Sequence, residues 1–341
     1  MKRARFISRT GLFLMTVILI AAGCSASPAT PTPAPADKIN IQLSWTHEYS
    51  SAAFYAAEKN NHFQEQNLAA TLLEGGFSNG KYIVPIDEVL AGSVDFGMSS
   101  ASDLLVARAQ GKPVVALATI LQQSPLAVIT LAKSNIRRPQ DLIGKKVAVA
   151  DGGAAQVYAS LLTSQGIDPA KVQTVSRTSF GVDPLVKGDV DALVGWVINE
   201  GVQVREAGQT PSFMLMSDYG VDSYDFVLFT SAQKLKTQSD LCERTIRAII
   251  AGLKDEIASP DQAVSYVLSY AKGLDLKGQG SRLQASIPLI NPPGTKLGMM
   301  ADSNWAISYK ILLDQNVITS PIDYKSVYSL QILNKIYGQG Q

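Results

Sequence analysis

Short apolar runs alternate along the chain with segments in which apolar residues recur every three to four positions. The short runs are typical of β-strands and the longer segments of amphipathic helices, which predicts strand, loop and helix units from residue 39 onward. Strands are expected at 39–43, 70–74, 94–98, 114–121, 126–131, 147–150, 172–176, 192–195, 213–216 and 226–230. Helices are expected at 51–61, 88–92, 104–110, 155–165, 184–188, 200–207, 241–258, 260–271, 298–315 and 324–337. This alternation indicates an α/β protein with largely parallel sheets.

Two places in the pattern join one apolar strand almost directly to the next. Residues 122–125 form a polar kink between two strands, and the run 226–230 follows a polar turn. A chain that crosses from one domain to another and later returns would show these features. We therefore expect one lobe formed by residues 38–123 and 229–341, and a second lobe formed by residues 124–228.

The first 37 residues do not share this pattern. Four basic residues precede an apolar run at 11–22 that is too short to span a bilayer and is typical of a secretory signal. The run ends in Ala-Ala-Gly-Cys, which resembles the lipobox of bacterial lipoproteins, although Ala21 stands where that motif usually has Leu. An ordinary signal peptide with an incidental cysteine is the alternative.

We expect residues 1–23 to be a lipoprotein signal peptide, with a diacyl anchor on Cys24. Residues 24–37, rich in Pro, Ala, Ser and Thr, would then be an extended tether. Two acyl chains would hold the protein stably on the outer face of the cell membrane.

Composition narrows the classes of function. Without the leader, 26 Lys and Arg stand against 29 Asp and Glu, so the charge balance predicts neither nucleic-acid binding nor a strongly charged ligand. Cys242 lies in a helical apolar pattern and is expected to be buried. The chain has two histidines and contains neither GxSxG nor HExxH. We expect a protein that is not an enzyme and holds neither metal nor cofactor.

Ligands of open parallel α/β sheets bind beyond the carboxyl ends of the strands. Five loops occupy such positions, at 45–50, 99–103, 151–154, 178–183 and 196–200, and they predict a cleft between the lobes. The candidate ligand-binding residues in these loops are Trp45, His47, Glu48, Tyr49, Ser99, Ser100, Asp103, Gly153, Phe180, Asp183, Trp196, Asn199 and Glu200.

The residue types in these loops suggest stacking and hydrogen bonding. Trp45, Tyr49 or Trp196 could stack on a planar ligand, although either tryptophan could instead pack in the core. Asn199 and Glu200 offer an amide and a carboxylate to ring N–H groups. Helix N–H groups near residue 153 could bind an anion, or the glycines there could form a plain turn.

Several segments of the chain resemble the substrate-binding proteins of ABC importers. They are 45–46 (WT), 54–57 (FYAA), 58–63, 92–97 (GSVDFG), 141–147 (DLIGKKV) and 187–192 (KGDVDA). The resemblance is to the branch with alkanesulfonate, thiamine-pyrimidine and riboflavin binding lipoproteins and the fungal thiamine-pyrimidine synthases. It implies a type II periplasmic-binding fold, with two α/β lobes joined by two crossings, that closes on a ligand and delivers it to a permease and its ATPase.

The resemblance distinguishes ligands mainly at residues 45–51. Pyrimidine binders tend to carry a WTPNTNH-like loop, whereas this chain has WTHEYSS. Sulfonate binders would need cationic or hydroxyl-rich contacts, whereas these aromatic loops favour a wider flat ligand. Because the 45–51 loop and the segment 196–201 (WVINEG) look most like the riboflavin-binding branch, we expect a monomeric riboflavin-binding protein.

Three alternatives stay open at this point. A thiamine pyrimidine precursor is the second candidate ligand. A thiamine-pyrimidine synthase-like enzyme is less favoured, because the chain lacks the cysteine-rich motif of those enzymes and has Ser51 where they have a histidine. A sensor or adhesin that only borrows the fold is the third alternative.

Overall fold

The computed structural model describes residue 1 and residues 35–78, 81–150, 153–177 and 181–338. The chain forms two units, Met1–Pro35 and Ala36–Gln341, and all that follows concerns the second. The proposed lipidation site Cys24 and the candidate Phe180 lie outside the described residues. None of the described helices has the length and apolar character needed to cross a membrane.

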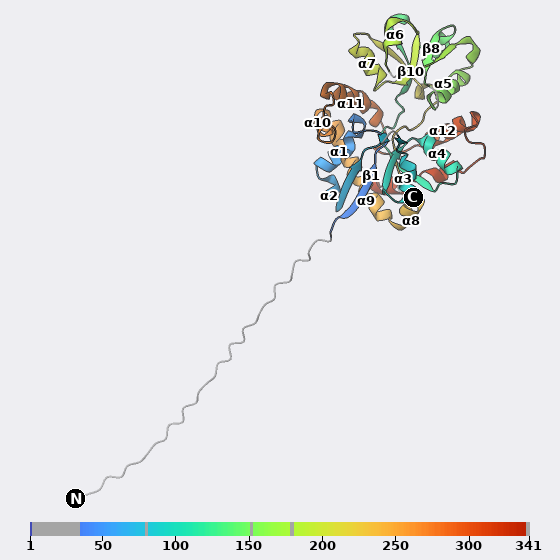
Figure 1. The fold of residues 1–341 in the computed structure, drawn as a ribbon. Helices are drawn as coiled ribbons and strands as arrows, with labels where there is room; N and C mark the ends of the chain where they lie inside the picture. The colour runs from blue at the N-terminus through green and yellow to red at the C-terminus, as the bar shows by residue number, and fades with distance from the viewer. Residues whose placement is uncertain (2–34, 79–80, 151–152, 178–180, 339–341) are drawn as a thin grey trace. The chain divides into compact units, whose positions relative to one another are not determined.

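The strands of the second unit form two five-stranded sheets and a short hairpin (Figure 1). The first sheet has the order β2-β1-β5-β12-β6, the second has the order β11-β7-β10-β8-β9, and β3 pairs with β4. The strands are β1 Asp37–Gln42, β2 Leu68–Leu73, β3 Phe77–Ser78, β4 Lys81–Tyr82, β5 Phe96–Ser99, β6 Val114–Thr119, β7 Leu126–Leu131, β8 Lys146–Val149, β9 Gln173–Ser176, β10 Ala192–Trp196, β11 Pro211–Leu215 and β12 Val227–Ser231.

Helices cover both sheets, which makes each lobe an α/β structure. They are α1 Ala52–Lys59, α2 His62–Glu65, α3 Pro85–Ala91, α4 Ala101–Ala109, α5 Gly153–Ser164, α6 Asp183–Lys187, α7 Glu200–Glu206, α8 Ala232–Thr237, α9 Ser239–Ala258, α10 Pro260–Tyr270, α11 Leu276–Ile290, α12 Asp302–Asp314 and α13 Gln331–Ile336. In Figure 1, α5, α6 and α7 surround β8 and β10, whereas α1, α2 and α9 lie by β1.

Each sheet contains one strand that is antiparallel to both of its neighbours. This strand is β12 in the first sheet and β7 in the second. Both strands directly follow a passage of the chain from one sheet to the other. The first passage is 120–125 and the second is 216–226. The fold is therefore two α/β lobes joined by two crossings, as the sequence predicts, and we propose that the lobes divide within these two passages.

The strands next to the first passage are buried on both faces. Every residue of β6 (VVALAT) and of β7 (LAVITL) is buried. Strands covered on both sides read as continuous apolar runs in the sequence, which is why both were predicted closely. Within the first passage itself, Ile120, Leu121 and Ser124 are also buried.

Helix α1 packs unusually closely on α9. A Cβ atom at Gly252 of α9 would lie 2.1 Å from the carbonyl oxygen of Ala53 and 2.9 Å from the backbone nitrogen of Ala57, so only glycine fits. The alanines of α1 are buried at this contact. Since α1 follows the 45–51 loop directly, the contact with α9 also anchors that loop.

One long helix has no predicted counterpart, and two predicted helical segments differ from the structure. Helix α11 was not predicted, because Gly278, Gly280 and Pro288 interrupt its pattern, yet it forms and buries Leu283 and Leu289. The predicted helix 324–337 is a 3₁₀ turn at Tyr324–Val327 followed by α13. The predicted helix 298–315 begins only at Asp302.

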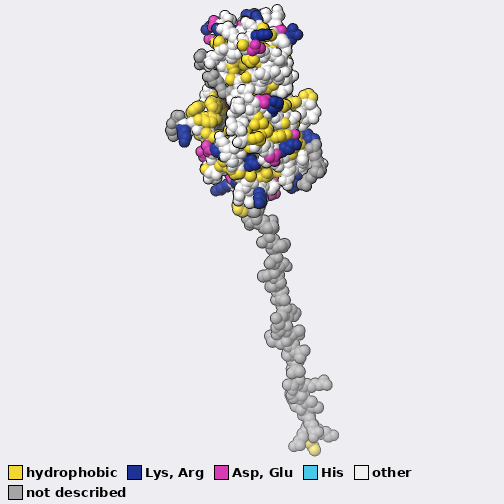
Figure 2. Space-filling model, turned by 90° about the vertical axis from the view of Figure 1, so that its right-hand side faces the viewer, with side chains coloured by type: hydrophobic (Ala, Val, Ile, Leu, Met, Phe, Trp, Pro, Cys, Tyr) yellow, Lys and Arg dark blue, Asp and Glu magenta, His cyan; other side chains and the backbone are white. Residues whose placement is uncertain are grey.

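Charged side chains of both signs are interspersed over the face shown in Figure 2 and do not gather by sign. Hydrophobic side chains on the same face lie together in patches. This surface fits the nearly balanced charge of the chain, with 30 Lys and Arg against 29 Asp and Glu. The described residues on this face form no basic stripe of the kind that tracks a nucleic-acid backbone.

Candidate ligand-binding site

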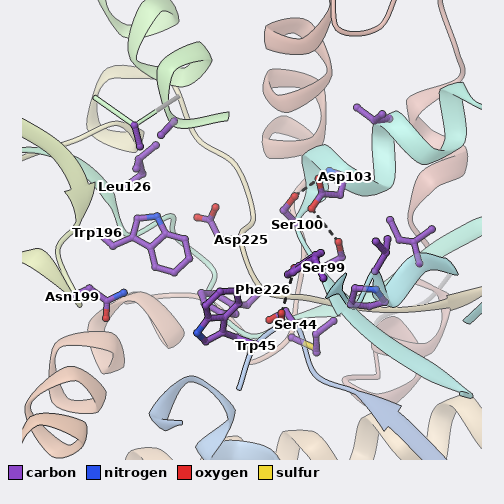
Figure 3. Close-up of a pocket in the computed structure, with 18 of the residues that line it drawn as sticks. Ser44, Trp45, Ser99, Ser100, Asp103, Leu126, Trp196, Asn199, Asp225 and Phe226 are labelled. Carbon is purple, nitrogen blue, oxygen red and sulfur yellow. Dashed lines mark hydrogen bonds between the residues drawn. The ribbon is translucent and has the colours of Figure 1, made fainter. Parts of the chain in front are cut away.

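A cavity of about 850 Å³ lies between the two lobes. The first lobe contributes Ser44, Trp45, Glu48, Tyr82, Val84, Pro85, Ile86, Met98, Ser99, Ser100, Asp103, Val106, Ala107, Gln110 and Lys112. The second contributes Ala150, Ala154, Arg177, Val194, Gly195, Trp196, Asn199, Glu200 and Gln203, and Leu126, Asp225 and Phe226 come from the ends of the passages. Figure 3 shows that Trp45 and Trp196 extend into this space from different lobes.

The loop that carries Trp45 is held against the end of β2. The Gly75 N–H donates to the carbonyl oxygen of Trp45 at 2.9 Å. A Cβ atom on Gly75 would stand 2.2 Å from the carbonyl oxygen of Leu43, so glycine is required for this approach. The Trp45 side chain is 44% exposed, and its ring lies 6.2 Å from that of Phe77 and 6.4 Å from that of Tyr82.

The start of α4 supplies the polar side of the first lobe. Ser100 caps the helix, since its Oγ accepts a hydrogen bond from the Asp103 N–H at 3.0 Å. Ser99 Oγ donates to Asp103 Oδ2 at 3.2 Å. The positive end of the helix dipole favours a carboxylate in this first turn. Asp103 is therefore fixed at the cavity by two neutral hydroxyls, since Ser99 donates to its carboxylate and Ser100 accepts from its backbone N–H (Figure 3).

A buried ion pair forms part of the wall in the second lobe. Glu200 Oε1 accepts from Arg177 at 2.9 Å, while Oε2 accepts from the Trp196 N–H at 2.8 Å. Both charged side chains are less than a tenth exposed. Gly195 makes room for the carboxylate, because a Cβ atom there would lie 2.9 Å from it. Glu200 thus positions Trp196 and neutralises Arg177.

The residues next to the second passage form the floor between the lobes. The ring of Phe226 meets that of Trp196 edge to face, with 5.5 Å between the ring centres. Asp225 accepts a hydrogen bond from Ser124 Oγ at 2.7 Å. Burial, with a smaller contribution from Asp222 and Asp103, raises the pKa of the Asp225 carboxyl to about 6, against the opposing effect of the Ser124 hydrogen bond.

Most of the residues predicted as ligand contacts line the cavity. They are Trp45, Glu48, Ser99, Ser100, Asp103, Trp196, Asn199 and Glu200. His47, Tyr49 and Asp183 are not among the lining residues. Gly153 begins α5, and its neighbour Ala154 does line the cavity.

The residues that do not line the cavity have other partners. His47 Nδ1 lies 2.8 Å from the Tyr55 hydroxyl, and the His47 ring centre is 5.2 Å from that of Tyr270. Burial lowers the pKa of the His47 imidazole, although Glu74 opposes this effect. Asp183, at the start of α6, pairs with Lys187 at 3.2 Å on an exposed surface.

Tyr49 connects the two lobes. It is 2% exposed, and its hydroxyl donates to Asn199 Oδ1 at 2.8 Å. Its backbone N–H donates to Gln279 Oε1 at 2.7 Å. One hydrogen bond thus joins the 45–51 loop of the first lobe to a lining residue of the second.

Sequence reasoning missed several lining residues. Arg177 directly follows β9, one position before the loop that was predicted to matter. Asp225 and Phe226 lie at the end of the second passage, where a side chain can either face the cleft or pack on the adjoining strand. Tyr82 ends a hairpin of two-residue strands and Val84 lies just after it, and strands this short leave no periodic signal.

Two α/β lobes that enclose a cavity of this size between two crossings define a class of small-molecule-binding proteins. In line with this, the periplasmic aliphatic sulphonate binding protein SsuA from Escherichia coli has the same fold. Its TM-score is 0.66 at 13% identity, over 85% of this chain and 91% of that one. The type II binding-protein fold expected from the sequence is thereby confirmed.

Residues 48–263 match the family described as NMT1/THI5 like, and the chain belongs to this family. The riboflavin-binding protein RibY of Chloroflexus aurantiacus is 25% identical over 91% of this chain and 90% of its own length. A formylaminopyrimidine-binding protein of Halalkalibacterium halodurans is 25% identical over 75% of this chain and 77% of its own. Other relatives are named as pyrimidine phosphate synthases. The family resemblance predicted from the sequence is confirmed.

Proposed function

We propose that this protein is an extracytoplasmic substrate-binding lipoprotein of an ABC importer that captures a flat aromatic heterocycle, with riboflavin as the first candidate. One observation carries the proposal. The cavity between the lobes receives one tryptophan from each lobe, Trp45 and Trp196. A planar ligand held by both would link the lobes in the closed form, which a permease and its ATPase would then recognise.

The size and chemistry of the cavity support a ligand larger than a single ring. Its volume of about 850 Å³ lies in the upper part of the usual range for small-molecule sites, whereas a lone pyrimidine would leave much of it empty. Ser99, Ser100 and Asn199 can exchange hydrogen bonds with ring and hydroxyl groups. The similarity to a riboflavin-binding protein along most of the chain points the same way.

A thiamine pyrimidine precursor is the second candidate ligand. The formylaminopyrimidine-binding relative favours it, while the departure of residues 45–51 from the pyrimidine pattern speaks against it. A synthase-like activity is less favoured than binding. The chain has two cysteines, one at the proposed lipidation site and one, Cys242, fully buried in the core.

The test of the ligand is a titration of the purified protein after unfolding, removal of bound molecules and refolding. The fluorescence of riboflavin should be quenched when it binds. Binding should also raise the midpoint of thermal unfolding, since a ligand at 100 times its Kd stabilises the folded protein by about 2.7 kcal/mol. Mass spectrometry of molecules carried by the natively purified protein gives an independent answer. If riboflavin has no effect on the refolded protein and the pyrimidine does, the second candidate replaces the first.

The proposal includes the lipid anchor on Cys24. Replacement of Cys24 with Ala should move the protein from the membrane fraction to the medium and abolish incorporation of labelled palmitate. A variant that stays in the membrane fraction and keeps the label would contradict the anchor. We expect the released protein to be monomeric in size-exclusion chromatography.

A further inference from the structure

We propose that the cavity accepts the uncharged form of its heterocycle and rejects the corresponding phosphate ester. The inference rests on the proposed function and adds a class of ligand that the site excludes. The residues responsible are Asp103, Asp225 and Glu48, three carboxylic acids in the lining. The balance between these acids and the cations of the same lining supports the proposal.

The cations of the described lining are already engaged. They are Arg177 and Lys112. Arg177 is paired with Glu200 at 2.9 Å in a buried contact, and Lys112 Nζ lies 2.7 Å from Asp87. Neither guanidinium nor ammonium is therefore left to balance a phosphate, because a bound anion would have to compete with a carboxylate already in place.

The three acids have hydroxyl partners in place of cations. Ser99 donates to Asp103, Ser124 donates to Asp225, and Ser50 Oγ lies 3.0 Å from Glu48 Oε1. None of the three forms an ion pair within the described part of the chain. A more distant cation, Arg282, acts on Glu48 by lowering its pKa, but burial has the larger and opposite effect.

The carboxylates of the described lining consequently favour a ligand that donates hydrogen bonds over one that only accepts them. A hydroxyl-rich chain such as the ribityl group can donate hydrogen bonds to Asp103 and Asp225 without bringing a charge. A phosphate at the end of that chain would add about two negative charges next to carboxylates in a partly dry site. Two like charges in contact repel strongly even at an effective dielectric constant of about 20.

The inference predicts that riboflavin binds at least about 30-fold more tightly than its 5′-phosphate at low salt. The ratio should shrink as salt rises, because the repulsion is partly screened. Titration calorimetry on the refolded protein measures both constants. The same comparison with 4-amino-5-hydroxymethyl-2-methylpyrimidine and its phosphate covers the second candidate ligand.

Two variants test whether the charge of the lining, and not the shape of the cavity, excludes the phosphate ester. Asp225→Asn keeps the size of the side chain and removes one charge, so binding of the phosphate should improve by about fivefold or more relative to riboflavin. Glu200→Gln leaves Arg177 without its carboxylate partner and should shift the ratio in the same direction. Asp314→Asn on α12, an exposed acid paired with Lys310, removes the same charge far from the lining and should leave the ratio unchanged.

Each outcome has a distinct meaning. If riboflavin and its phosphate bind within about threefold of each other at low salt, the inference is wrong while the proposed function stands. If only the unphosphorylated pyrimidine binds, riboflavin is excluded and the inference holds. If either phosphate binds more tightly than its neutral partner, or if neither pair binds, the inference fails.

Discussion

The hydroxyl of Tyr49 fixes a lining residue of one lobe from the other. Tyr49→Phe removes this hydroxyl, keeps the buried ring and frees Asn199 Oδ1. A single neutral hydrogen bond contributes about 0.5–1.5 kcal/mol, so we expect the ligand to dissociate about two- to tenfold faster, with little change in its association rate. Stopped-flow fluorescence measures both rates.

Tyr55→Phe is the matched control for this variant. Like Tyr49, Tyr55 is buried, lies outside the cavity lining and would lose a hydrogen bond, to His47, but it does not connect the lobes. An effect of Tyr49→Phe no larger than that of Tyr55→Phe would show that Tyr49 only supports local structure.

Trp45 combines exposure with a place in the cavity wall. Trp45→Ala should weaken ligand binding several-fold, since stacking contributes about 0.5–1.5 kcal/mol beyond area burial. Its 44% exposure means that the free energy of unfolding should change little. Phe77→Ala, which removes an exposed ring beside Trp45 but outside the lining, provides the comparison. A loss with Phe77→Ala as large as that with Trp45→Ala would show that the affinity depends on the packing around Trp45 and not on stacking by Trp45 alone.

Glu256 on α9 is a buried acid whose ionisation should destabilise the fold. It is 3% exposed, and its Oε2 has no hydrogen-bond partner in the described structure. Burial raises the pKa of this carboxyl from 4.5 to about 8. A raised carboxyl pKa means that the native state binds the extra proton, so stability falls as pH rises between these two values.

Glu256→Gln should remove that pH dependence. We expect the variant to be more stable than the natural protein by about 1–3 kcal/mol at about pH 9 and nearly equal to it at about pH 4. Urea unfolding at the two pH values measures the difference. A constant difference across this range would mean that the Glu256 carboxyl has the same pKa in the folded and the unfolded protein.

The contact between α1 and α9 depends on a single missing Cβ atom. Gly252→Ala should destabilise the protein by about 1–3 kcal/mol, because the added methyl group would overlap the backbone of α1. Ligand binding should also weaken, since α1 carries the 45–51 loop. Thermal unfolding and ligand titration of the same sample test both effects.

Gly280→Ala in α11 is the control for this substitution. No atom lies within 4 Å of a Cβ at Gly280, so alanine should stabilise the helix by about 0.5–1 kcal/mol. If the two substitutions change the free energy of unfolding in opposite directions, close packing at Gly252 and not helix propensity explains the loss of stability. A stabilising Gly252→Ala would mean that α1 can shift at little cost.

At the level of elements, the sequence predicts those helices and strands whose apolar pattern is regular. Strands β6 and β7 are buried on both faces, so their apolar runs are unbroken. Helix α11 was missed because its glycines and Pro288 oppose helix formation locally, and only packing against the rest of the lobe overrides them. Two-residue strands such as β3 and β4 are too short to leave any pattern.

At the level of the whole molecule, the carboxyl-end rule predicted which loops meet but not which side chains face the ligand. Trp45 and Trp196 line the cavity as the rule suggests, whereas Tyr49, from the same loop as Trp45, turns away to join the lobes. For Asp225, which belongs to a passage between sheets that the rule does not cover, the sequence left contact with the cleft and packing on the strand equally open. The relative placement of the two lobes depends on contacts between residues far apart in the sequence, so no local pattern predicts it.

The positions of the three tryptophans give the protein a built-in optical signal. Trp45 and Trp196 border the cavity, so a bound chromophore would change their emission. Trp305 is fully buried, with its ring stacked 5.2 Å from that of Tyr328, and its emission should stay blue-shifted and constant. The ratio of the two components would report occupancy in unlabelled protein, independently of concentration and lamp intensity.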